Sequence, residues 1–157
     1  MSFENIENIN IRAATNAEID NIKTLIFGVL REYALKPEPN GTDIDLNDIE
    51  ANYVHRNGTF EILENGNGEL LGTFGLYPID AETVELRKMY FDKKIRGKGF
   101  GKLTLQRAIA TAKTLGFKRI YLETNTVLHE AIGLYQKFGF VETQEKHSPR
   151  CDKAFIL

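Results

Sequence analysis

Cysteine is almost missing from this sequence of 157 residues. Because Cys151 is the single cysteine, an intramolecular disulfide and a paired-cysteine metal or redox motif are both excluded. The three histidines, His55, His129 and His147, lack the spacing of metal ligands. No apolar run approaches the length of a membrane-spanning helix. We therefore expect no bound metal, no membrane insertion and a cytoplasmic location, where the thiol stays reduced.

A strong excess of charge of one sign is also lacking. The net charge is -2 and the charged residues make up 27% of the chain, so the composition does not demand a nucleic-acid partner. Lysine and arginine gather over residues 87–102, which favours a local anionic ligand, with a solvated run of charge as the alternative. Residues 1–12 fit neither a secretory signal nor a targeting helix. The length is that of one domain, and we expect a single domain over residues 1–157.

Two periodicities of apolar residues predict a mixed α/β fold. Alternating patterns predict strands over residues 8–12, 59–64, 70–77, 83–91, 119–124 and 154–157. Helical spacing predicts helices after a capping box at Thr15 and Glu18, near residues 49–53, and over residues 99–115 and 128–138. The order of these elements predicts a mixed sheet covered by helices.

The strand predicted over residues 83–91 contains a fault in its alternation. Val84 and Leu86 share one face, whereas strict alternation places Met89 and Phe91 on the other. One extra residue near Arg87 would bring the four apolar side chains to the same face. We therefore expect a β-bulge at this point.

A glycine-rich basic segment connects this predicted strand to the next predicted helix. It reads Arg96, Gly97, Lys98, Gly99, Phe100, Gly101 and Lys102. Free backbone amides and the positive end of the helix can converge there on a phosphate or pyrophosphate. The alternative is a flexible connector with solubilising charges. Alternating glycines at a helix start favour the phosphate site.

Two well-known phosphate-binding motifs do not fit this segment. A Walker loop would need glycine where Arg96 stands and serine or threonine where Leu103 stands. A dinucleotide fingerprint that starts at Gly97 would need glycine in place of Lys102. Nucleotide hydrolysis and dinucleotide binding therefore both lose support.

The segment does match the acetyl-CoA signature R/Q-x-x-G-x-G/A, filled by Arg96, Gly99 and Gly101. Residues 85–92 resemble the bulged strand of the GNAT superfamily of N-acetyltransferases, and residues 131–140 resemble its second motif. The ordered set covers roughly residues 84–141. The resemblance implies an acyl-CoA N-acyltransferase fold, with a mixed, mostly antiparallel central sheet whose central strand is bulged and splayed and which helices flank.

The same resemblance implies where the cosubstrate acetyl-CoA would bind. Its pantetheine arm would run along the opening beside the bulged strand, on the backbone of Met89, Tyr90 and Phe91. Amides of residues 97–102, with Arg96 beside them, would hold the pyrophosphate. Asn125 resembles a polar residue that reaches the coenzyme, with capping of the following helix as the alternative.

Acetyl transfer to an amine needs a base, an acid and a donor to the carbonyl oxygen, because an alkylamine keeps its proton up to about pH 10. By resemblance, Tyr135 is the acid toward the CoA sulfur, with a core aromatic as the alternative. Glu85 resembles the base, with a solvated or salt-bridged residue as the alternative. A backbone amide near Met89 would stabilise the oxyanion. Direct attack within a ternary complex needs no nucleophile, which leaves Cys151 a structural thiol.

The acceptor is less clearly indicated than the donor. The carboxylates between Asp43 and Glu50 would attract a cationic amine or form an exposed acidic loop. Arg150 would suit the carboxylate of an acceptor, so a small-molecule or amino-acid-like amine is favoured over a protein lysine or N-terminus. Because similar proteins frequently dimerise, the resemblance leaves a homodimer open.

Two rival functions use the same residues. One is a non-catalytic module of this fold that binds acyl-CoA as a sensor, and the other is a nucleic-acid-binding domain that uses the basic cluster. Tyr135 and Glu85 favour the enzyme over both of these.

Overall fold

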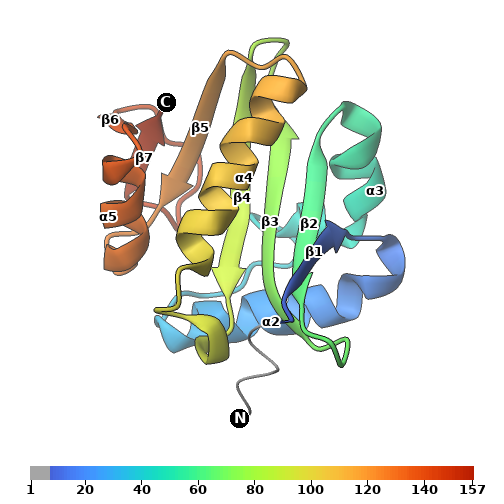
Figure 1. The fold of residues 1–157 in the computed structure, drawn as a ribbon. Helices are drawn as coiled ribbons and strands as arrows, with labels where there is room; N and C mark the ends of the chain where they lie inside the picture. Colours follow the sequence, from blue (N-terminus) through green and yellow to red (C-terminus); the bar gives the residue numbers. More distant parts are fainter. Residues whose placement is uncertain (1–7) are drawn as a thin grey trace.

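A seven-stranded sheet with the order β1-β2-β3-β4-β5-β7-β6 forms the centre of the molecule. The computed structural model of the chain describes residues 8–157 (Figure 1). The expectation for residues 1–12 falls mostly on residues 1–7, which lie outside this range. Neighbouring strands pair antiparallel except β4 and β5, which pair parallel. The predicted mixed, mostly antiparallel sheet is therefore confirmed.

The elements follow the predicted order along the chain. The strands are β1 (Asn10–Ala13), β2 (Thr59–Glu64), β3 (Leu70–Pro78), β4 (Thr83–Phe91), β5 (Arg119–Thr124), β6 (Val141–Thr143) and β7 (Lys153–Ile156). The α-helices are α2 (Ile19–Glu32), α3 (Ile49–Asn52), α4 (Phe100–Thr114) and α5 (His129–Lys137). Short 3-10 helices are η1 (Asn16–Glu18), η2 (Ile44–Asn47), η3 (Val54–Arg56) and η4 (Lys93–Ile95).

Helices cover both faces of the sheet, and each face has its own apolar cluster. On one face α4 and α5 pack against the strands, with α4 across the front of the sheet in Figure 1. On the other face α2 and α3 pack, and α2 lies behind the sheet in the same view. The first cluster is centred on Leu105, Ala108 and Leu122, and the second on Ile22, Ile26 and Phe60. A sheet buried on both sides keeps the strand ends fixed in space.

The hairpin between β2 and β3 closes as the residues predict. The side chain of Asn65 accepts hydrogen bonds from the amides of Asn67 and Glu69 at 3.0 and 2.9 Å. Gly68 adopts the left-handed conformation with φ 77°, which glycine allows at little cost. The turn thus fixes the antiparallel register of the two strands.

The predicted bulge is present in β4. Lys88 and Met89 together oppose Phe74 of β3 at the point where the register shifts. Lys88 has φ 57°, a left-handed conformation that is uncommon outside glycine. The extra residue brings the apolar side chains of both halves of the strand into one cluster. These side chains are Val84, Leu86, Met89 and Phe91.

The bulge also separates β4 from its parallel neighbour. β4 pairs with β5 only over residues 83–85, against residues 119–121. Beyond Glu85 the register of the described residues contains no further pair between these strands. The two strands therefore part in the middle of the sheet, and this opening positions the site.

Candidate active site

A cavity of about 1030 Å³ lies where β4 and β5 part. Its wall includes all of β4 from Glu85 to Phe91 and residues 123–125, which end β5 and follow it. The glycine-rich loop, α2, α5 and residues 147–151 also line the cavity, together with Gly41, Thr42, Ile44, Asp45 and Tyr77. Pockets for a single small molecule measure roughly 300–1,000 Å³. The cavity lies at the upper end of this range and is large enough for an extended ligand.

The start of α4 forms one end of this cavity. Gly99 precedes the helix in a left-handed conformation with φ 89°, and Gly97 has φ 72°. No atom comes within 4 Å of the place where a β-carbon would stand on either glycine. Because the first-turn amides of a helix have no intrahelical partner, they stay available to an anion. The open cradle fits the diphosphate of a coenzyme.

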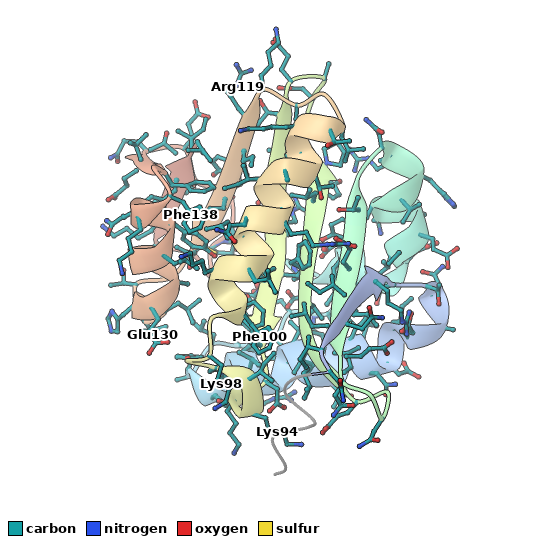
Figure 2. All side chains as sticks on the ribbon, in the orientation of Figure 1. Lys94, Lys98, Phe100, Arg119, Glu130 and Phe138 are labelled. Atoms are coloured by element: carbon teal, nitrogen blue, oxygen red, sulfur yellow. The ribbon has the colours of Figure 1, made fainter. Side chains whose placement is uncertain are left out.

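The predicted phosphate-binding residues differ in where their side chains lie. Arg96, Gly97, Gly99, Gly101 and Lys102 line the cavity. The side chain of Phe100 instead packs against the apolar cluster under α4, and Lys98 is exposed at the loop (Figure 2). For these last two residues, a contact with phosphate can come through the backbone.

Arg96 is already engaged by the protein. Its Nε donates to the carbonyl oxygen of Phe91 at 2.8 Å, and Nη1 and Nη2 donate to Glu32 at 2.8 and 3.2 Å. These bonds tie the glycine-rich loop to the end of β4 and to α2. They make Arg96 a support of the loop, and its contact with phosphate remains a prediction.

The backbone expected to hold the pantetheine arm lies along the cavity. Met89, Tyr90 and Phe91 all line it on the side where β5 has parted from β4. Burial raises the pKa of Tyr90 to about 12, so its phenol is neutral at physiological pH. The contacts of these three residues with a pantetheine arm stay a prediction.

Tyr135 lies on α5 with its ring in the core and also lines the cavity. It is 6% exposed, and its ring centroid is 5.7 Å from that of Phe140 and 6.3 Å from that of Phe155. Burial raises the pKa of Tyr135 above its ordinary range, so the phenol keeps its proton at neutral pH. The two alternatives from the sequence, core aromatic and proton donor, are therefore compatible.

Glu85 stands at the last position where β4 pairs with β5, opposite Tyr121. Its Oε1 lies 2.8 Å from Nε of Arg87, and the carboxylate lines the cavity. Burial raises the pKa of Glu85, and the charge of Arg87 opposes that shift in part. Glu85 is thus both salt-bridged and open to the cavity, where a carboxylate of raised pKa is a better base.

Asn125 organises the turn that follows β5. Its Nδ2 donates to the carbonyl oxygen of Arg150 at 2.9 Å, and its Oδ1 accepts from the amide of Val127 at 3.1 Å. The residue that precedes α5 is Leu128, so Asn125 does not cap that helix. It lines the cavity, and its contact with the coenzyme stays a prediction.

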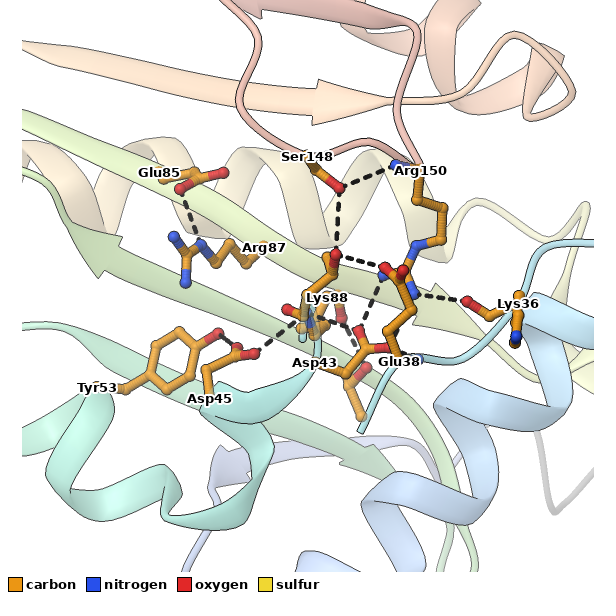
Figure 3. A network of polar contacts seen from close by, with 12 residues as sticks. Lys36, Glu38, Asp43, Asp45, Tyr53, Glu85, Arg87, Lys88, Ser148 and Arg150 are labelled. Atoms are coloured by element: carbon orange, nitrogen blue, oxygen red, sulfur yellow. Dashed lines mark hydrogen bonds and ion pairs between the residues drawn. The ribbon is translucent and has the colours of Figure 1, made fainter. Parts of the chain in front are cut away.

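A buried network of four charges joins Lys88 of β4 to Asp43, Asp45 and Arg150 at the cavity wall (Figure 3). Nζ of Lys88 lies 3.1 Å from Asp43 and 3.3 Å from Asp45. Arg150 donates two hydrogen bonds to Asp43, at 2.8 and 2.9 Å. Burial opposes the ionisation of Asp43, but the hydrogen bonds from Arg150 and the charge of Lys88 outweigh it and lower the pKa of Asp43 to about 2.

This network corrects two expectations. Asp43 and Asp45 are buried, so the view of this stretch as an exposed acidic loop is wrong for both. The guanidinium of Arg150 is held by Asp43 and is not free for an acceptor. The bulge was predicted, but its effect on this wall was not: the extra residue breaks the alternation of side chains along β4. Here Arg87 and Lys88 both face this wall.

Two features are absent from residues 8–157, the part of the chain that the structure describes. Within them, no group of three or more His, Cys, Asp and Glu side chains is arranged to hold a metal ion. In the same range, no helix is long and apolar enough to cross a membrane. The expectation of a metal-free site stays a prediction.

Comparison with known proteins agrees with the site geometry. The family model for the acetyltransferase (GNAT) family matches residues 26–140. The Escherichia coli K12 protein YjgM, described as an uncharacterized N-acetyltransferase, is 36% identical over 135 residues, which are 83% of this chain and 80% of that protein. Human N-acetyltransferase 8B is 28% identical over 70% of this chain, and the match covers 52% of the human protein.

Solved structures show the same architecture. An acetyltransferase of the GNAT family from Staphylococcus aureus Mu50 superposes with a TM-score of 0.88 and 26% identity, over 94% of this chain and 97% of that one. YncA of Salmonella typhimurium, solved with acetyl-CoA, has a TM-score of 0.74 at 20% identity, over 96% and 93% of the two chains. Together with the family match over residues 26–140, these similarities show that the protein belongs to the acetyltransferase (GNAT) family of acyltransferase enzymes.

Proposed function

We propose that the protein transfers the acetyl group of acetyl-CoA to the primary amine of a small-molecule acceptor, by direct attack within a ternary complex. One observation carries the proposal. A single cavity joins the open amides at the start of α4, the gap beside β4, and the side chains of Glu85 and Tyr135. Such an arrangement aligns a thioester with an amine and lowers the entropic cost of their meeting.

Residues of this chain fit the donor at one end of the cavity. Amides of residues 97–102 would bind the diphosphate, and the backbone of residues 89–91 would bind the pantetheine arm. Support comes from structures of the same fold. The Salmonella protein was solved with acetyl-CoA, and spermidine N-acetyltransferase of Vibrio cholerae, with a TM-score of 0.70, was solved with CoA and spermine. The second of these also supports a small-molecule acceptor.

The proton transfers that the reaction requires give Glu85 and Tyr135 separate roles. Glu85 takes a proton from the acceptor ammonium, directly or through water, because only the neutral amine attacks. The C–N bond forms as the C–S bond breaks, and backbone donors at the bulge near Met89 stabilise the charge on the carbonyl oxygen. Tyr135 gives its proton to the departing sulfur. Glu85 releases the first proton to solvent before the attack, and the second proton, lost from nitrogen as the amide forms, replaces the one that Tyr135 gave up, so that one proton leaves per turnover.

The test is an acceptor screen. The protein is incubated with acetyl-CoA and a panel of small amines, amino acids and lysine peptides, while free thiol and acetylated product are measured. We expect both to appear in equal amounts with small amines. Binding of acetyl-CoA without turnover across the panel would support the sensor instead, and turnover confined to peptides would support a protein acetyltransferase.

Four further expectations accompany this proposal. Residues 1–157 would form a single domain. The protein would be located in the cytoplasm, and it would not bind nucleic acid. Assembly into a homodimer is compatible with the proposal. DNA binding that acetyl-CoA fails to displace would contradict the third of these.

A further inference from the structure

The guanidinium of Arg87 enters the half of the cavity that lies next to Glu85. Its Nε donates to Glu85 at 2.8 Å, and its Cζ lies 3.7 Å from the ring centroid of Tyr77. Figure 3 shows that a single dashed line reaches this side chain and that its two terminal nitrogens carry none. Among residues 8–157, these two nitrogens have no hydrogen-bond partner.

Contacts on two sides hold this guanidinium in place. The carboxylate of Glu85 fixes Nε, and the ring of Tyr77 supports the flat face. A side chain that is already ordered loses little freedom when it binds a ligand. The two terminal N–H groups present a planar fork, whose geometry matches the two oxygens of a carboxylate.

Neighbouring cations in this half of the cavity are neutralised by the protein. Lys88 is held between Asp43 and Asp45, and Arg150 is held by Asp43. This network pairs two positive with two negative charges. Arg87 therefore offers the free donors on this wall.

Two carboxylates, those of Glu85 and Glu123, lie on the side of the Arg87 guanidinium that faces β5. Glu85 is opposite Tyr121 in the parallel register, and Glu123 follows on the same face of β5. Oε1 of Glu123 accepts hydrogen bonds from the backbone amides of His147 and Ser148, both at 2.9 Å. These two carboxylates would attract an ammonium group next to the carboxylate-binding fork of Arg87.

We propose that Arg87 is the acceptor-recognising residue, and that it binds the carboxylate of a free amino acid whose amino group lies beside Glu85. This inference rests on the proposed function and narrows its acceptor to one chemical class. It assigns to Arg87 the role that the sequence had indicated for Arg150, because Arg150 is already bound to Asp43.

The experiment compares matched acceptors at saturating acetyl-CoA. For several amino acids, kcat/KM is measured beside that of the corresponding amide and of the decarboxylated amine. With the unaltered protein we expect the amino acid to be preferred over its amide by about 10- to 100-fold, the usual effect of a charged bidentate contact. In Arg87→Gln this ratio falls close to one, mainly through a higher KM for the amino acid.

The ratio isolates the contact from indirect effects. Arg87→Gln also removes the ion pair of Glu85, but that change affects both acceptors of a matched pair and cancels in the ratio. Arg87→Lys, which keeps the charge and loses the fork, should retain part of the preference. Arg56→Gln is the matched control, since Arg56 stacks on the same Tyr77 ring at 4.3 Å and does not line the cavity. Its ratio should stay that of the unaltered protein.

The outcomes separate the two proposals. Turnover of amines without preference for the carboxylate, or an equal loss of preference in Arg56→Gln, overturns the role of Arg87 and leaves the acetyltransferase standing. Binding of acetyl-CoA with no turnover of any acceptor overturns the proposed function itself. Circular dichroism and acetyl-CoA affinity verify that each variant is folded with its donor site intact. If Arg87→Gln does not fold, the comparison rests on Arg87→Lys.

Discussion

Tyr135 illustrates how one side chain serves both packing and chemistry. Its ring packs near those of Phe140 and Phe155 in the core, and the residue also lines the cavity. Phenylalanine keeps the ring and removes only the proton that is proposed to reach the sulfur. The substitution therefore separates the two roles.

We expect Tyr135→Phe to lower kcat by about 100-fold or more, in the usual range for loss of a general acid. The affinity for acetyl-CoA, measured by calorimetry, should change little, and so should the free energy of unfolding. A kcat equal to that of the unaltered protein would remove Tyr135 from the mechanism.

The protonation of Glu85 should determine how the acetyltransferase rate falls at low pH. A base works only when deprotonated, so kcat/KM should fall as the pH drops through the pKa of Glu85, which burial has raised. In Arg87→Gln the opposing charge is lost, and this limb should move to higher pH. Glu85→Gln should lower the rate and abolish the limb. A profile that is the same in all three proteins would show that another group is the base.

The placement of residues at the cavity could be predicted from the sequence where a motif carries them. Gly99, Tyr135 and Glu85 stand in ordered motifs, and the structure brings all three to one cavity. Arg150 was assigned to the acceptor because an arginine suits a carboxylate. Its true partner, Asp43, is 107 positions away in the sequence. Spacing along a chain carries no information on such a pairing.

At the scale of elements, the glycine before α4 has the clearest consequence. Gly99 and Gly116 stand just before and just after the same helix, with φ 89° and 93°, and neither has an atom within 4 Å of a β-carbon position. Valine at either place is strained by about 1–2 kcal/mol. The two positions differ in that only Gly99 lines the cavity.

We therefore expect Gly99→Val to abolish measurable acetyl-CoA affinity, because the strained loop withdraws the amides that hold the diphosphate. Gly116→Val should lose a similar amount of stability and keep the affinity. Titration calorimetry and urea unfolding of both variants provide the comparison. Retained affinity in Gly99→Val, or equal loss in the two, would contradict the phosphate site.

Element boundaries were predictable where turn residues mark them. β2, β4 and β5 have the predicted bounds, and the bulge follows from the break in alternation along β4. β1 begins at Asn10, two residues later than its alternation suggests, because pairing with β2 and not periodicity sets its start. No bounds were predicted for the short strand β6 (Val141–Thr143).

At the scale of the whole molecule, the buried charges link distant parts of the chain. Asp43 belongs to the segment after α2, Lys88 to the central strand and Arg150 to the loop before β7. Removing one partner of a buried ion pair leaves an uncompensated charge and costs about 3–5 kcal/mol. The network therefore stabilises the wall of the cavity as a unit.

This network should make the protein sensitive to acid. Because the pKa of Asp43 is lowered from 3.8 to about 2, its contribution is fully present above the unfolded value and is lost as the pH falls toward 2. The loss amounts to about 2 kcal/mol. Urea unfolding between pH 2 and 7 measures it. Asp43→Asn should show a smaller acid dependence, whereas Asp80→Asn, at an exposed turn, should retain most of it. Parallel curves for Asp43→Asn and the unaltered protein would contradict the role of the pair.

The strand order has a consequence for the nascent polypeptide. β7 lies between β5 and β6 although it is made after both, so during synthesis β5 has an open edge and β6 has no neighbour until residues 153–156 emerge from the ribosome. Phe155, which is buried in the finished sheet, also arrives at that moment. The half of the sheet beside α5 can therefore close only after translation has passed these residues, and until then the edge of β5 is unpaired.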